Sequence, residues 1–380
     1  MRVALLITCH LEYTAQLANA LSAYAEVSIH MLAGTNYLLP DNWRFPNVEL
    51  FRNKYEPYLD SRVHLGYVNP SPWKWAPRGL LGIARLLRAI GDAKPDVLHL
   101  QEALDYRIFL TIMGLLDIPL VVTAHDVVQR YGDKRRFYTN TEIILRALVR
   151  KRARRIIVHG ENLKHTLQEQ MGSSAERVTV VPMGALDLYK AWLSAEVEEE
   201  DGNVLFFGRI LPYKGLDLLV QAEPFVTSEF PQAKFVIAGS GDNMEPYFQM
   251  MTHPEHFVFD NRYIPNEEVA GFFQRASVVV LPYKDVSQSA VAALACAFGK
   301  PVVSTRVGDL PELIEDGVTG LLVPPGDVGA LAGAILRLLK DPDLRARMGQ
   351  NALDRARSDL SWATVAEKTY HVYQDAIACR

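Results

Sequence analysis

The chain has 380 residues, of which 49% are hydrophobic and 22% are charged, and its formal net charge is −4. This composition excludes intrinsic disorder, and the length exceeds what one hydrophobic core usually serves, so two globular domains are expected. The charge is uneven, because residues 1–190 carry 24 Lys and Arg against 18 Asp and Glu whereas residues 191–380 carry 16 against 26.

Cysteines and apolar runs indicate the compartment. Cys9, Cys296 and Cys379 are odd in number and far apart, which argues against a disulfide framework or a cysteine metal cluster and favours a reducing cytoplasm. The apolar start at Val3–Ile7 is too short for a signal-peptide core. The longest apolar run, Ile108–Leu116, ends well short of a bilayer span. We therefore expect a cytoplasmic protein.

Predicted strands and helices alternate along the whole chain, which is typical of an α/β protein with parallel sheets. In the amino half we predict strands at residues 3–7, 97–100, 120–123, 156–159 and 178–181, and helices near 15–24, 108–115 and 163–170. In the carboxyl half we predict strands at 204–207, 235–238, 257–259, 278–281, 301–304 and 320–323, and helices at 266–275, 326–340, 342–355 and 362–378.

An acidic stretch, Glu196–Gly202, separates the two series and predicts an exposed linker over residues 184–203. We expect two doubly wound Rossmann-like domains, one over residues 1–183 and one over residues 204–358, with the helix at 362–380 joined to the first. If the domains face each other across a cleft, the carboxyl ends of both sheets surround one ligand site.

The segment Leu205–Leu219 carries the strongest functional signal. Its apolar run stops at Gly208 and Arg209, and helical spacing restarts at Gly215, so Arg209 and Lys214 lie at a strand-to-helix junction. Such a junction offers backbone N–H groups to anions at the carboxyl end of a parallel strand. Two cations at this place favour a diphosphate-binding site, although solvated surface charges are the alternative.

Further motifs make this signal specific. The chain reads Phe207-Gly-Arg-x-x-x-x-Lys-Gly215, Phe235-Val-Ile-Ala-Gly-Ser-Gly-Asp242, Phe298-Gly-Lys-Pro-Val-Val303 and Gly308-Asp-Leu-Pro-Glu312, and more loosely Val121-Val-Thr-Ala-His-Asp126, His159-Gly-Glu161 and Val180-Val-Pro-Met-Gly184. In this order the motifs resemble glycosyltransferase family 4 of the GT-B fold. The resemblance implies retaining transfer of a hexose from a nucleotide-diphosphate sugar, which is a substrate, with no metal and no other cofactor. We expect a lipid-linked or polysaccharide acceptor.

On this resemblance, Arg209 and Lys214 are the catalytic cations, because the departing diphosphate gains negative charge as its bond to the sugar breaks. The predicted donor-binding residues follow strands or open helices. Gly208, Gly239 and Gly241 permit close approach of the backbone to the ligand. The main chain of Tyr263 and Ile264 holds the base. The backbone N–H groups at the start of a helix come from Gln288, Ser289, Ala290 and Val291, and the last predicted donor-binding residue is Glu312.

One part of the family pattern is missing. The family carries two glutamates separated by seven residues, and alignment on Gly299–Pro301 puts Val286 and Leu294 at those places. The stretch Asp285–Ala290 instead resembles a variant that has a Gln-Ser-Gly turn. Since Leu294 offers no carboxylate to the ribose hydroxyls, the nucleotide contacts must be rearranged or weaker.

In the amino half, His125 ends an apolar strand and matches a family position beside the donor sugar. We predict that it binds a hydroxyl of the transferred sugar and belongs to the catalytic group, although a buried structural histidine is the usual alternative. Many family members carry two glycines after the first strand, where this chain has Thr8–Glu12. His10 or Tyr13 could replace the contacts of that loop, and we place both on the acceptor side with Asp126.

The segment Arg130–Arg155 holds ten basic residues and two acidic ones. Apolar residues interleave with the cations, as in a helix that lies on an anionic membrane, with a solvated surface helix as the alternative. A second basic and aromatic stretch surrounds Trp73 and Trp75. We predict peripheral contact with the inner membrane face. We expect no nucleic-acid partner, because no nucleic-acid motif accompanies the charge.

Two apparent metal motifs have simpler interpretations. Asp341 and Asp343 flank a proline at a predicted helix start, where aspartate caps free N–H groups. His253 and His256 lack a clear third ligand, so we predict no metal. Two alternatives to sugar transfer stay open. One is a nucleotide-sugar epimerase of similar architecture, which turns over the donor without an acceptor, and the other is a non-catalytic homologue that binds nucleotide.

Overall fold

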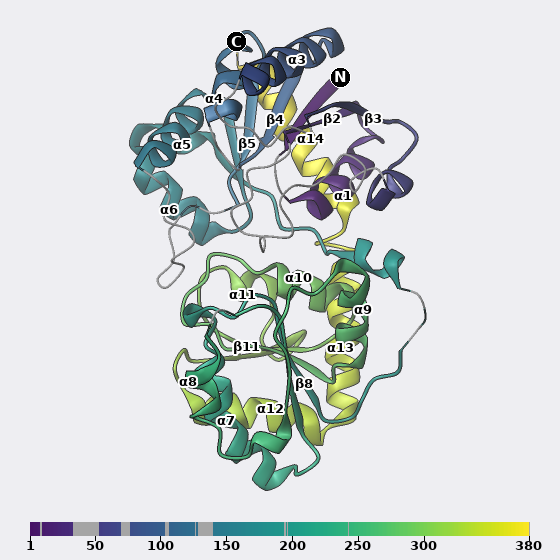
Figure 1. The fold of residues 1–380 in the computed structure, drawn as a ribbon, viewed down its shortest axis with the longest axis vertical. Coiled ribbons are helices and arrows are strands. Elements are labelled where there is room, and N and C mark those ends of the chain that lie inside the picture. The colour runs from purple at the N-terminus through teal and green to yellow at the C-terminus, as the bar shows by residue number, and fades with distance from the viewer. Residues whose placement is uncertain are drawn as a thin grey trace. The chain divides into compact units, whose positions relative to one another are not determined.

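A computed structural model describes residues 1–7, 10–32, 53–69, 77–102, 106–125, 127, 140–193, 195, 197–241 and 243–379. The chain divides into two compact units. Unit 1 comprises Met1–Val127, Arg135–Pro182 and Trp362–Arg380, and unit 2 contains Met183–Ser361. Figure 1 follows the chain from purple at the amino terminus to yellow in the last helix, which returns to unit 1.

Within the described residues, unit 1 is built on a seven-stranded sheet of order β3-β2-β1-β4-β5-β6-β7. All pairs are parallel, and Val3 of β1 pairs with Val27 of β2 and Val97 of β4. The order reverses between β1 and β4, which in doubly wound sheets marks the ligand-binding end. The strands are β1 (Arg2–Ile7), β2 (Glu26–Leu32), β3 (Val63–Asn69), β4 (Val97–Gln101), β5 (Leu120–Thr123), β6 (Arg155–Val158) and β7 (Val178–Val180).

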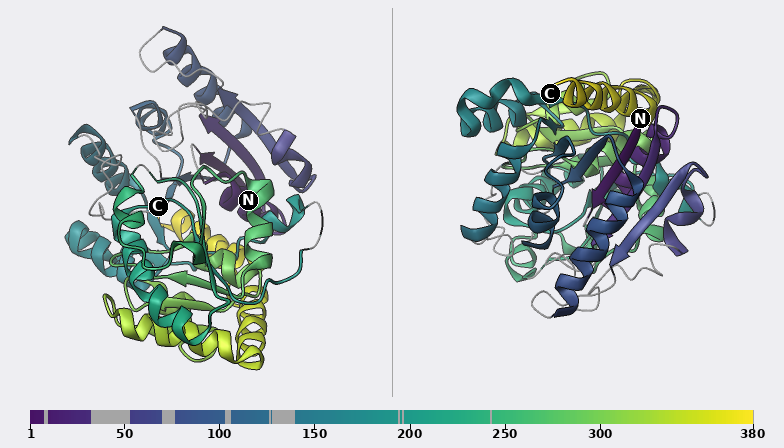
Figure 2. Two further views of the ribbon diagram at one scale, coloured as in Figure 1. Left: turned by 60° about the horizontal axis from the view of Figure 1, so that its bottom comes forward. Right: turned by 90° about the horizontal axis from the view of Figure 1, so that it is seen from above.

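Helices cover both faces of this sheet (Figure 2). Four helices, α3, α4, α5 and α6, share a core with alternate strand residues such as Leu98 and Leu100. The opposite face carries α14, whose Tyr373 reaches His99 of β4, and α1 packs beside α14. The helices are α1 (Leu11–Leu21), α3 (Pro77–Ala93), α4 (Tyr106–Met113), α5 (Asn140–Arg152), α6 (Glu161–Met171) and α14 (Trp362–Ala378).

Unit 2 has a six-stranded parallel sheet within the described residues, of order β10-β9-β8-β11-β12-β13. Val204 of β8 pairs with Phe235 of β9 and Val278 of β11, so the order reverses between β8 and β11. The strands are β8 (Asn203–Phe207), β9 (Lys234–Ala238), β10 (Phe257–Asp260), β11 (Val278–Leu281), β12 (Val302–Thr305) and β13 (Gly320–Val323). The helices are α7 (Leu216–Glu229), α8 (Glu245–Phe248), α9 (Asn266–Arg275), α10 (Ala290–Ala297), α11 (Leu310–Leu313), α12 (Val328–Lys340) and α13 (Pro342–Arg357).

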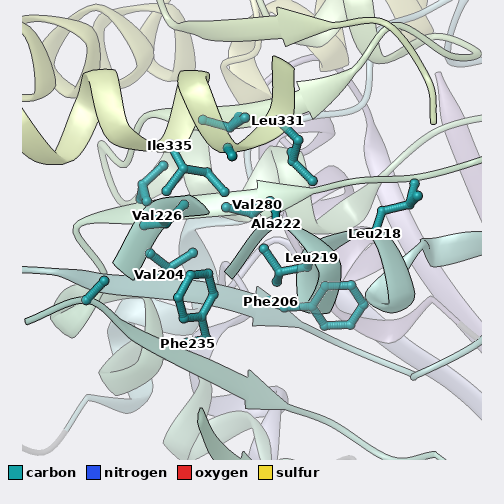
Figure 3. Packing of buried hydrophobic residues seen from close by; sticks show 14 of the residues in the cluster. Val204, Phe206, Leu218, Leu219, Ala222, Val226, Phe235, Val280, Leu331 and Ile335 are labelled. Carbon is teal, nitrogen blue, oxygen red and sulfur yellow. The ribbon is translucent and has the colours of Figure 1, made fainter. Parts of the chain in front are cut away.

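The core of unit 2 holds the ends of its strands in place. Helices α7 and α12 pack against each other, and Figure 3 shows Leu219, Leu331 and Ile335 in one cluster with Phe206 and Val280 of the strands. These side chains are buried. Alternate residues of each strand reach the same face, and helical residues three or four apart share one side, so both patterns meet in one cluster.

The predicted fold class is confirmed, and every strand predicted above lies within one residue of an observed strand. The first helix begins and ends earlier than predicted. Among the described elements of unit 1, β2, β3 and α3 were not predicted. In β2 the buried Val27, Ile29 and Met31 alternate with polar residues, and β3 is an edge strand interrupted by Gly66, so neither forms a continuous apolar run. Among the described helices, none has the length and apolar character needed to cross a bilayer.

Candidate active site

In unit 2, the loops after β8 and β11 begin at the point where the strand order reverses. The loop after β8 carries Gly208, Arg209 and Lys214, and the loop after β11 leads through Ser289 into α10. Doubly wound sheets bind ligands at this place because the two loops turn to opposite faces. The sequence-predicted cations and the predicted helix start therefore lie at the same end of the same sheet.

Lys214 and α10 meet at Gly208. A Cβ atom on Gly208 would lie 3.0 Å from Nζ of Lys214 and 3.7 Å from Cγ2 of Val291, the second residue of α10. The same Nζ lies 5.5 Å from the centre of the Tyr283 ring. An ammonium group and the positive end of a helix thus converge over a residue without a side chain, which is the composition of an anion site.

Backbone packing fixes the position of Lys214. Gly215, the next residue, has φ 69°, and a Cβ there would lie 1.9 Å from the carbonyl oxygen of Pro282. The N–H of Lys284 donates to the carbonyl oxygen of Tyr213 at 2.7 Å. The side chain of Lys284 pairs with Asp217 at 2.6 Å. Asp217 lies in the first turn of α7, and its carboxylate is held by this ion pair.

Ser289 begins α10 as its N-cap. Its hydroxyl accepts a hydrogen bond from the N–H of Ala292 at 3.3 Å, so one of the free donors of the first turn is occupied. The N–H groups of Ala290 and Val291 also belong to this first turn, which has no intrahelical acceptors. Val286 and Leu294 are buried at 3% and 5% exposure, so both hydrophobic replacements serve the core.

The predicted glycines after β9 pack against protein. A Cβ on Gly239 would lie 2.1 Å from the carbonyl oxygen of Gly208, and one on Gly241 would lie 2.9 Å from Cβ of Ile210. The N–H of Gly241 donates to Oδ1 of Asn261 at 2.8 Å. These glycines therefore allow the loops after β8, β9 and β10 to approach one another.

The remaining predicted donor residues lie in loops of the same unit. Tyr263 and Ile264 follow β10; Ile264 is buried and Tyr263 is half-buried, with its hydroxyl 3.5 Å from Asn266. Gln288 precedes the N-cap of α10. Glu312 is exposed in the short helix α11, where its carbonyl oxygen accepts from Arg355.

In unit 1, the loop after β1 presents His10 in an unusual conformation. His10 is the N-cap of α1 with φ 58°, a left-handed geometry that glycine adopts readily and other residues rarely. Its ring stacks on His125 with centroids 3.9 Å apart. A histidine thus holds a backbone conformation here that glycine adopts more readily.

His125 belongs to a buried chain of hydrogen bonds. Its Nδ1 lies 3.1 Å from Nε2 of His159, and Nδ1 of His159 lies 2.9 Å from the carbonyl oxygen of Val181. A carbonyl oxygen can only accept, so Nδ1 of His159 carries a proton, and its Nε2 accepts while the ring is neutral. Nδ1 of His125 must then donate. Nε2 of His125 lies 2.7 Å from Oε1 of Gln101. An amide oxygen only accepts, so this contact suits a His125 ring that carries a proton on both nitrogens. If the ring is neutral, the Gln101 amide must be rotated so that its NH2 group donates to Nε2.

The chain continues through His99, which contacts Thr123 at 2.7 Å and the hydroxyl of Tyr373 at 2.6 Å. Burial lowers the pKa of His99 to about 3 and that of His159 to about 4, so both rings are neutral near pH 7. Tyr13 packs edge-on against His125 and His159, and burial raises the pKa of its phenol. Of the predicted residues here, Asp126 lies outside the described residues.

Sequence reasoning missed Gln101 and His99 and gave His159 no role. His99 and Gln101 are two residues apart on β4 and therefore reach the same face of the sheet. The sequence did carry a signal for them, because two polar side chains at alternate positions of an otherwise apolar strand need hydrogen-bond partners when that strand is buried.

The two apparent metal motifs make other contacts in the structure. Asp341 caps α13 by accepting from the N–H of Leu344 at 2.8 Å, as predicted. His253 contacts Glu223, and His256 contacts the carbonyl oxygen of Ala233. Throughout the part of the chain that the structure describes, no group of three or more His, Cys, Asp or Glu side chains could hold a metal ion.

Comparisons with known proteins agree with this arrangement. Residues 12–185 match the model described as Glycosyltransferase Family 4, and residues 201–341 match Glycosyl transferases group 1. The D-inositol 3-phosphate glycosyltransferase of Corynebacterium aurimucosum is 30% identical over 305 residues, covering 74% of this chain and 72% of that protein. The enzyme of the same name from Kribbella flavida is 30% identical over 333 residues, covering 79% and 77%.

Solved structures share the fold at lower identity. Sucrose-phosphate synthase from Thermosynechococcus elongatus superposes with a TM-score of 0.70 at 19% identity over 100% of both chains. Anabaena HepE in complex with UDP and glucose superposes with a TM-score of 0.66 at 16% identity over 98% of both chains. With two doubly wound parallel-sheet units and family matches on both halves, the chain belongs to glycosyltransferase family 4 and has the GT-B fold.

Proposed function

We propose that this protein is a retaining hexosyltransferase that uses a nucleotide-diphosphate sugar and a lipid-linked or polysaccharide acceptor, without a metal or other cofactor. The names of its relatives and the UDP and glucose bound to HepE support this class of donor. In the reaction, the bond between the anomeric carbon and the phosphate oxygen breaks, and that oxygen keeps the electron pair. The acceptor oxygen bonds to the same face of the carbon, and its proton passes to the departing phosphate.

The observation that carries the proposal is the meeting of Lys214 and α10 over Gly208. A departing diphosphate placed there contacts the Lys214 ammonium group and the N–H groups of Ala290 and Val291. Arg209, half-buried one residue after Gly208, supplies the second cation. These donors are fixed by the fold before the reaction, and donors arranged in advance stabilise developing charge without reorganisation.

His125 is the proposed contact for a hydroxyl of the transferred sugar. In the structure His125 is 2% exposed, and both nitrogens of its ring lie within hydrogen-bonding distance of protein groups. A sugar hydroxyl therefore exchanges with Gln101 at Nε2 while His159 keeps Nδ1. His10, whose ring stacks on that of His125, is half-buried. We assign His10 to the acceptor side of the site.

The deciding experiment offers UDP-, GDP- and ADP-sugars to the full chain and measures release of nucleoside diphosphate. One donor should be hydrolysed slowly, and the Lys214→Met variant should lose this activity. An epimerase would change the sugar without net loss of the donor, and a non-catalytic homologue would bind nucleotide in calorimetry without turnover. Either result would contradict the proposed transfer reaction.

A further inference from the structure

A charged clamp closes the loop between β10 and α9. The guanidinium group of Arg262 donates to the carboxylate of Asp260 from Nε at 2.7 Å and from Nη2 at 2.9 Å. On its other side it donates to the carboxylate of Glu268 from Nη1 at 3.1 Å and also from Nη2. Asp260 is the last residue of β10, and Glu268 lies in the first turn of α9. One planar side chain therefore joins the end of the strand to the start of the helix.

This clamp, made of Asp260, Arg262 and Glu268, contributes more to the shape of the loop than to stability. Its side chains are 27%, 45% and 45% exposed in that order, and exposed ion pairs usually add little to stability. An arginine that is held by a carboxylate on each side nevertheless has one orientation, because both carboxylates fix the plane of the guanidinium group. Hydrogen bonds from Arg262 also lower the pKa of Glu268, so this pair is charged near neutral pH.

Asn261 joins the same loop to the loop after β9. Its Oδ1 accepts from the N–H of Gly241 at 2.8 Å, and its Nδ2 donates to the carbonyl oxygen of Gly241 at 3.4 Å. The N–H of Gly239 donates to the carbonyl oxygen of Asp260 at 3.0 Å. The two loops are thus connected at the carboxyl ends of their strands, which is the end where doubly wound sheets bind ligands.

Tyr263 and Ile264 lie inside the segment that the clamp closes. Ile264 is buried and Tyr263 is half-buried. The N–H of Glu268 donates to the carbonyl oxygen of Pro265 at 2.9 Å, so the start of α9 is held as well. A ligand contact made through the main chain needs placement within about 0.5 Å, and the closed clamp restricts the main chain between residues 260 and 268.

We infer that Arg262 is a positioning residue for the nucleobase of the donor. It fixes the main chain of Tyr263 and Ile264, while its own guanidinium group is occupied by the carboxylates of the clamp. This inference rests on the proposed function, in which the main chain of these two residues contacts the base. The proposed diphosphate contacts come from Lys214 and α10, on the loops after β8 and β11, so opening the clamp weakens binding of the base and spares the diphosphate.

Calorimetry of the full chain with two probes tests this inference. Inorganic pyrophosphate reports the diphosphate contacts alone, and the tightest binder among UDP, GDP and ADP reports the base as well. Arg262→Gln should weaken binding of that nucleotide about tenfold, a loss of roughly one hydrogen bond, and should leave pyrophosphate binding unchanged. In donor hydrolysis the same variant should raise KM about tenfold with kcat near the wild-type value.

Lys340→Gln is the matched control. Lys340 is also 45% exposed, and it pairs with Glu229, so the variant likewise removes one exposed cation from an ion pair. These two residues end α12 and α7, away from the loop between β10 and α9. The control should bind both probes like the wild type.

Glu268→Gln separates positioning from a general loss of stability. It opens one side of the clamp, so it should also weaken nucleotide binding and leave pyrophosphate binding unchanged. Adding Arg262→Gln to Glu268→Gln should cost less affinity than Arg262→Gln costs alone. The melting temperatures of both single variants should stay close to that of the wild type. Fully additive losses would show that Arg262 does not act through the clamp.

Equal nucleotide binding by Arg262→Gln and the wild type would overturn the positioning role, as would an equal loss for pyrophosphate. A wild-type chain that binds no nucleotide more tightly than pyrophosphate would show that this loop holds no base. These outcomes do not depend on turnover. If Arg262→Gln loses nucleotide affinity alone but the wild type hydrolyses no donor, the transfer reaction is wrong and the role of Arg262 stands.

Discussion

Nε2 of His159 lies 3.1 Å from Nδ1 of His125, and the Val181 carbonyl oxygen on the far side of His159 fixes which of these atoms donates. Neutral His159 accepts, so His125 holds a proton on Nδ1. In the proposed reaction, Nε2 of His125 exchanges its contact with Gln101 for a sugar hydroxyl. If His125 binds the sugar as proposed, His159 is a positioning residue that acts through His125.

We predict that His159→Phe lowers kcat/KM about tenfold, because His125 loses the acceptor that fixes its tautomer, a loss of roughly one hydrogen bond. The effect should fall mainly on KM for the donor. A double-mutant cycle checks the mechanism. In a His125→Ala background, His159→Phe should cause no further loss of kcat/KM, whereas a full additional loss would show that His159 acts independently of His125.

Acid should destabilise unit 1. Burial lowers the pKa of His30 and His159 to about 4 and that of His99 to about 3. In the unfolded chain each histidine titrates near 6.5, so between roughly pH 6.5 and pH 4 the unfolded state binds more protons. The free energy of unfolding therefore falls as the pH falls, by up to about 1.4 kcal/mol per pH unit for each histidine.

Thermal unfolding of the wild type and His99→Gln from pH 7 to pH 4.5 measures this dependence. His99→Gln should unfold at a lower temperature at pH 7, because Tyr373 and Thr123 lose their shared partner. Its decline toward acid should be flatter than that of the wild type. Parallel declines would mean that His99 is not held neutral in the folded state.

The loops after β8 and β11 were more predictable from sequence than the histidine chain, and the reason is physical. Gly208, Lys214 and Ser289 sit in local patterns: a strand end, a turn and a helix start. Their meeting follows once parallel strands are recognised. The histidine chain joins residues from β4, the loop after β5, the loop after β6 and α14. No local pattern gives the register that brings these together.

The basic segment shows the same limit. Its composition predicted a charged surface, yet Arg146 and Arg150 pair with the buried Glu102, which lies 44 and 48 residues earlier in the sequence. The basic residues at 130 and 134–136 lie outside the described residues. The sequence could not reveal which face of the helix points inward. The orientation of the helix is set by the pairing of its arginines with the buried carboxylate of Glu102, since an unpaired charge at that position would be costly.

Lys214→Met should lower turnover about a hundredfold, the loss expected when one fixed donor of roughly 3 kcal/mol is removed from the leaving group. Stability should change little, because Lys214 is half-buried and its stem can still pack. Lys284→Met is the matched control. Lys284 is 46% exposed and pairs with Asp217, so its loss should leave turnover near the wild-type value. Steady-state kinetics and melting temperatures of both variants decide the matter, and equal effects would remove Lys214 from the mechanism.

Two substitutions of His10 separate its backbone from its ring. Both His10→Gly and His10→Ala remove the stack on His125, but only alanine keeps the cost of a left-handed backbone at φ 58°. We therefore expect His10→Gly to be more stable than His10→Ala by about 1 kcal/mol. Chemical denaturation measures the difference. If the alanine variant is the more stable, His10 does not hold that conformation in solution.

The loop that carries Lys214 should be sensitive to any side chain at Gly215. Alanine there combines φ 69° with a Cβ placed 1.9 Å from the carbonyl oxygen of Pro282, so the loops after β8 and β11 must separate. Gly326→Ala is the control within the same unit, because Gly326 has φ 78° and open space around its Cβ position. Gly326→Ala should cost about 1 kcal/mol of stability and leave turnover intact. Gly215→Ala should cost more and should also displace the Lys214 ammonium group from α10, which lowers turnover. Donor hydrolysis and thermal unfolding of the two variants test this, and a Gly215→Ala enzyme with wild-type turnover would show that the approach of the two loops does not position the lysine.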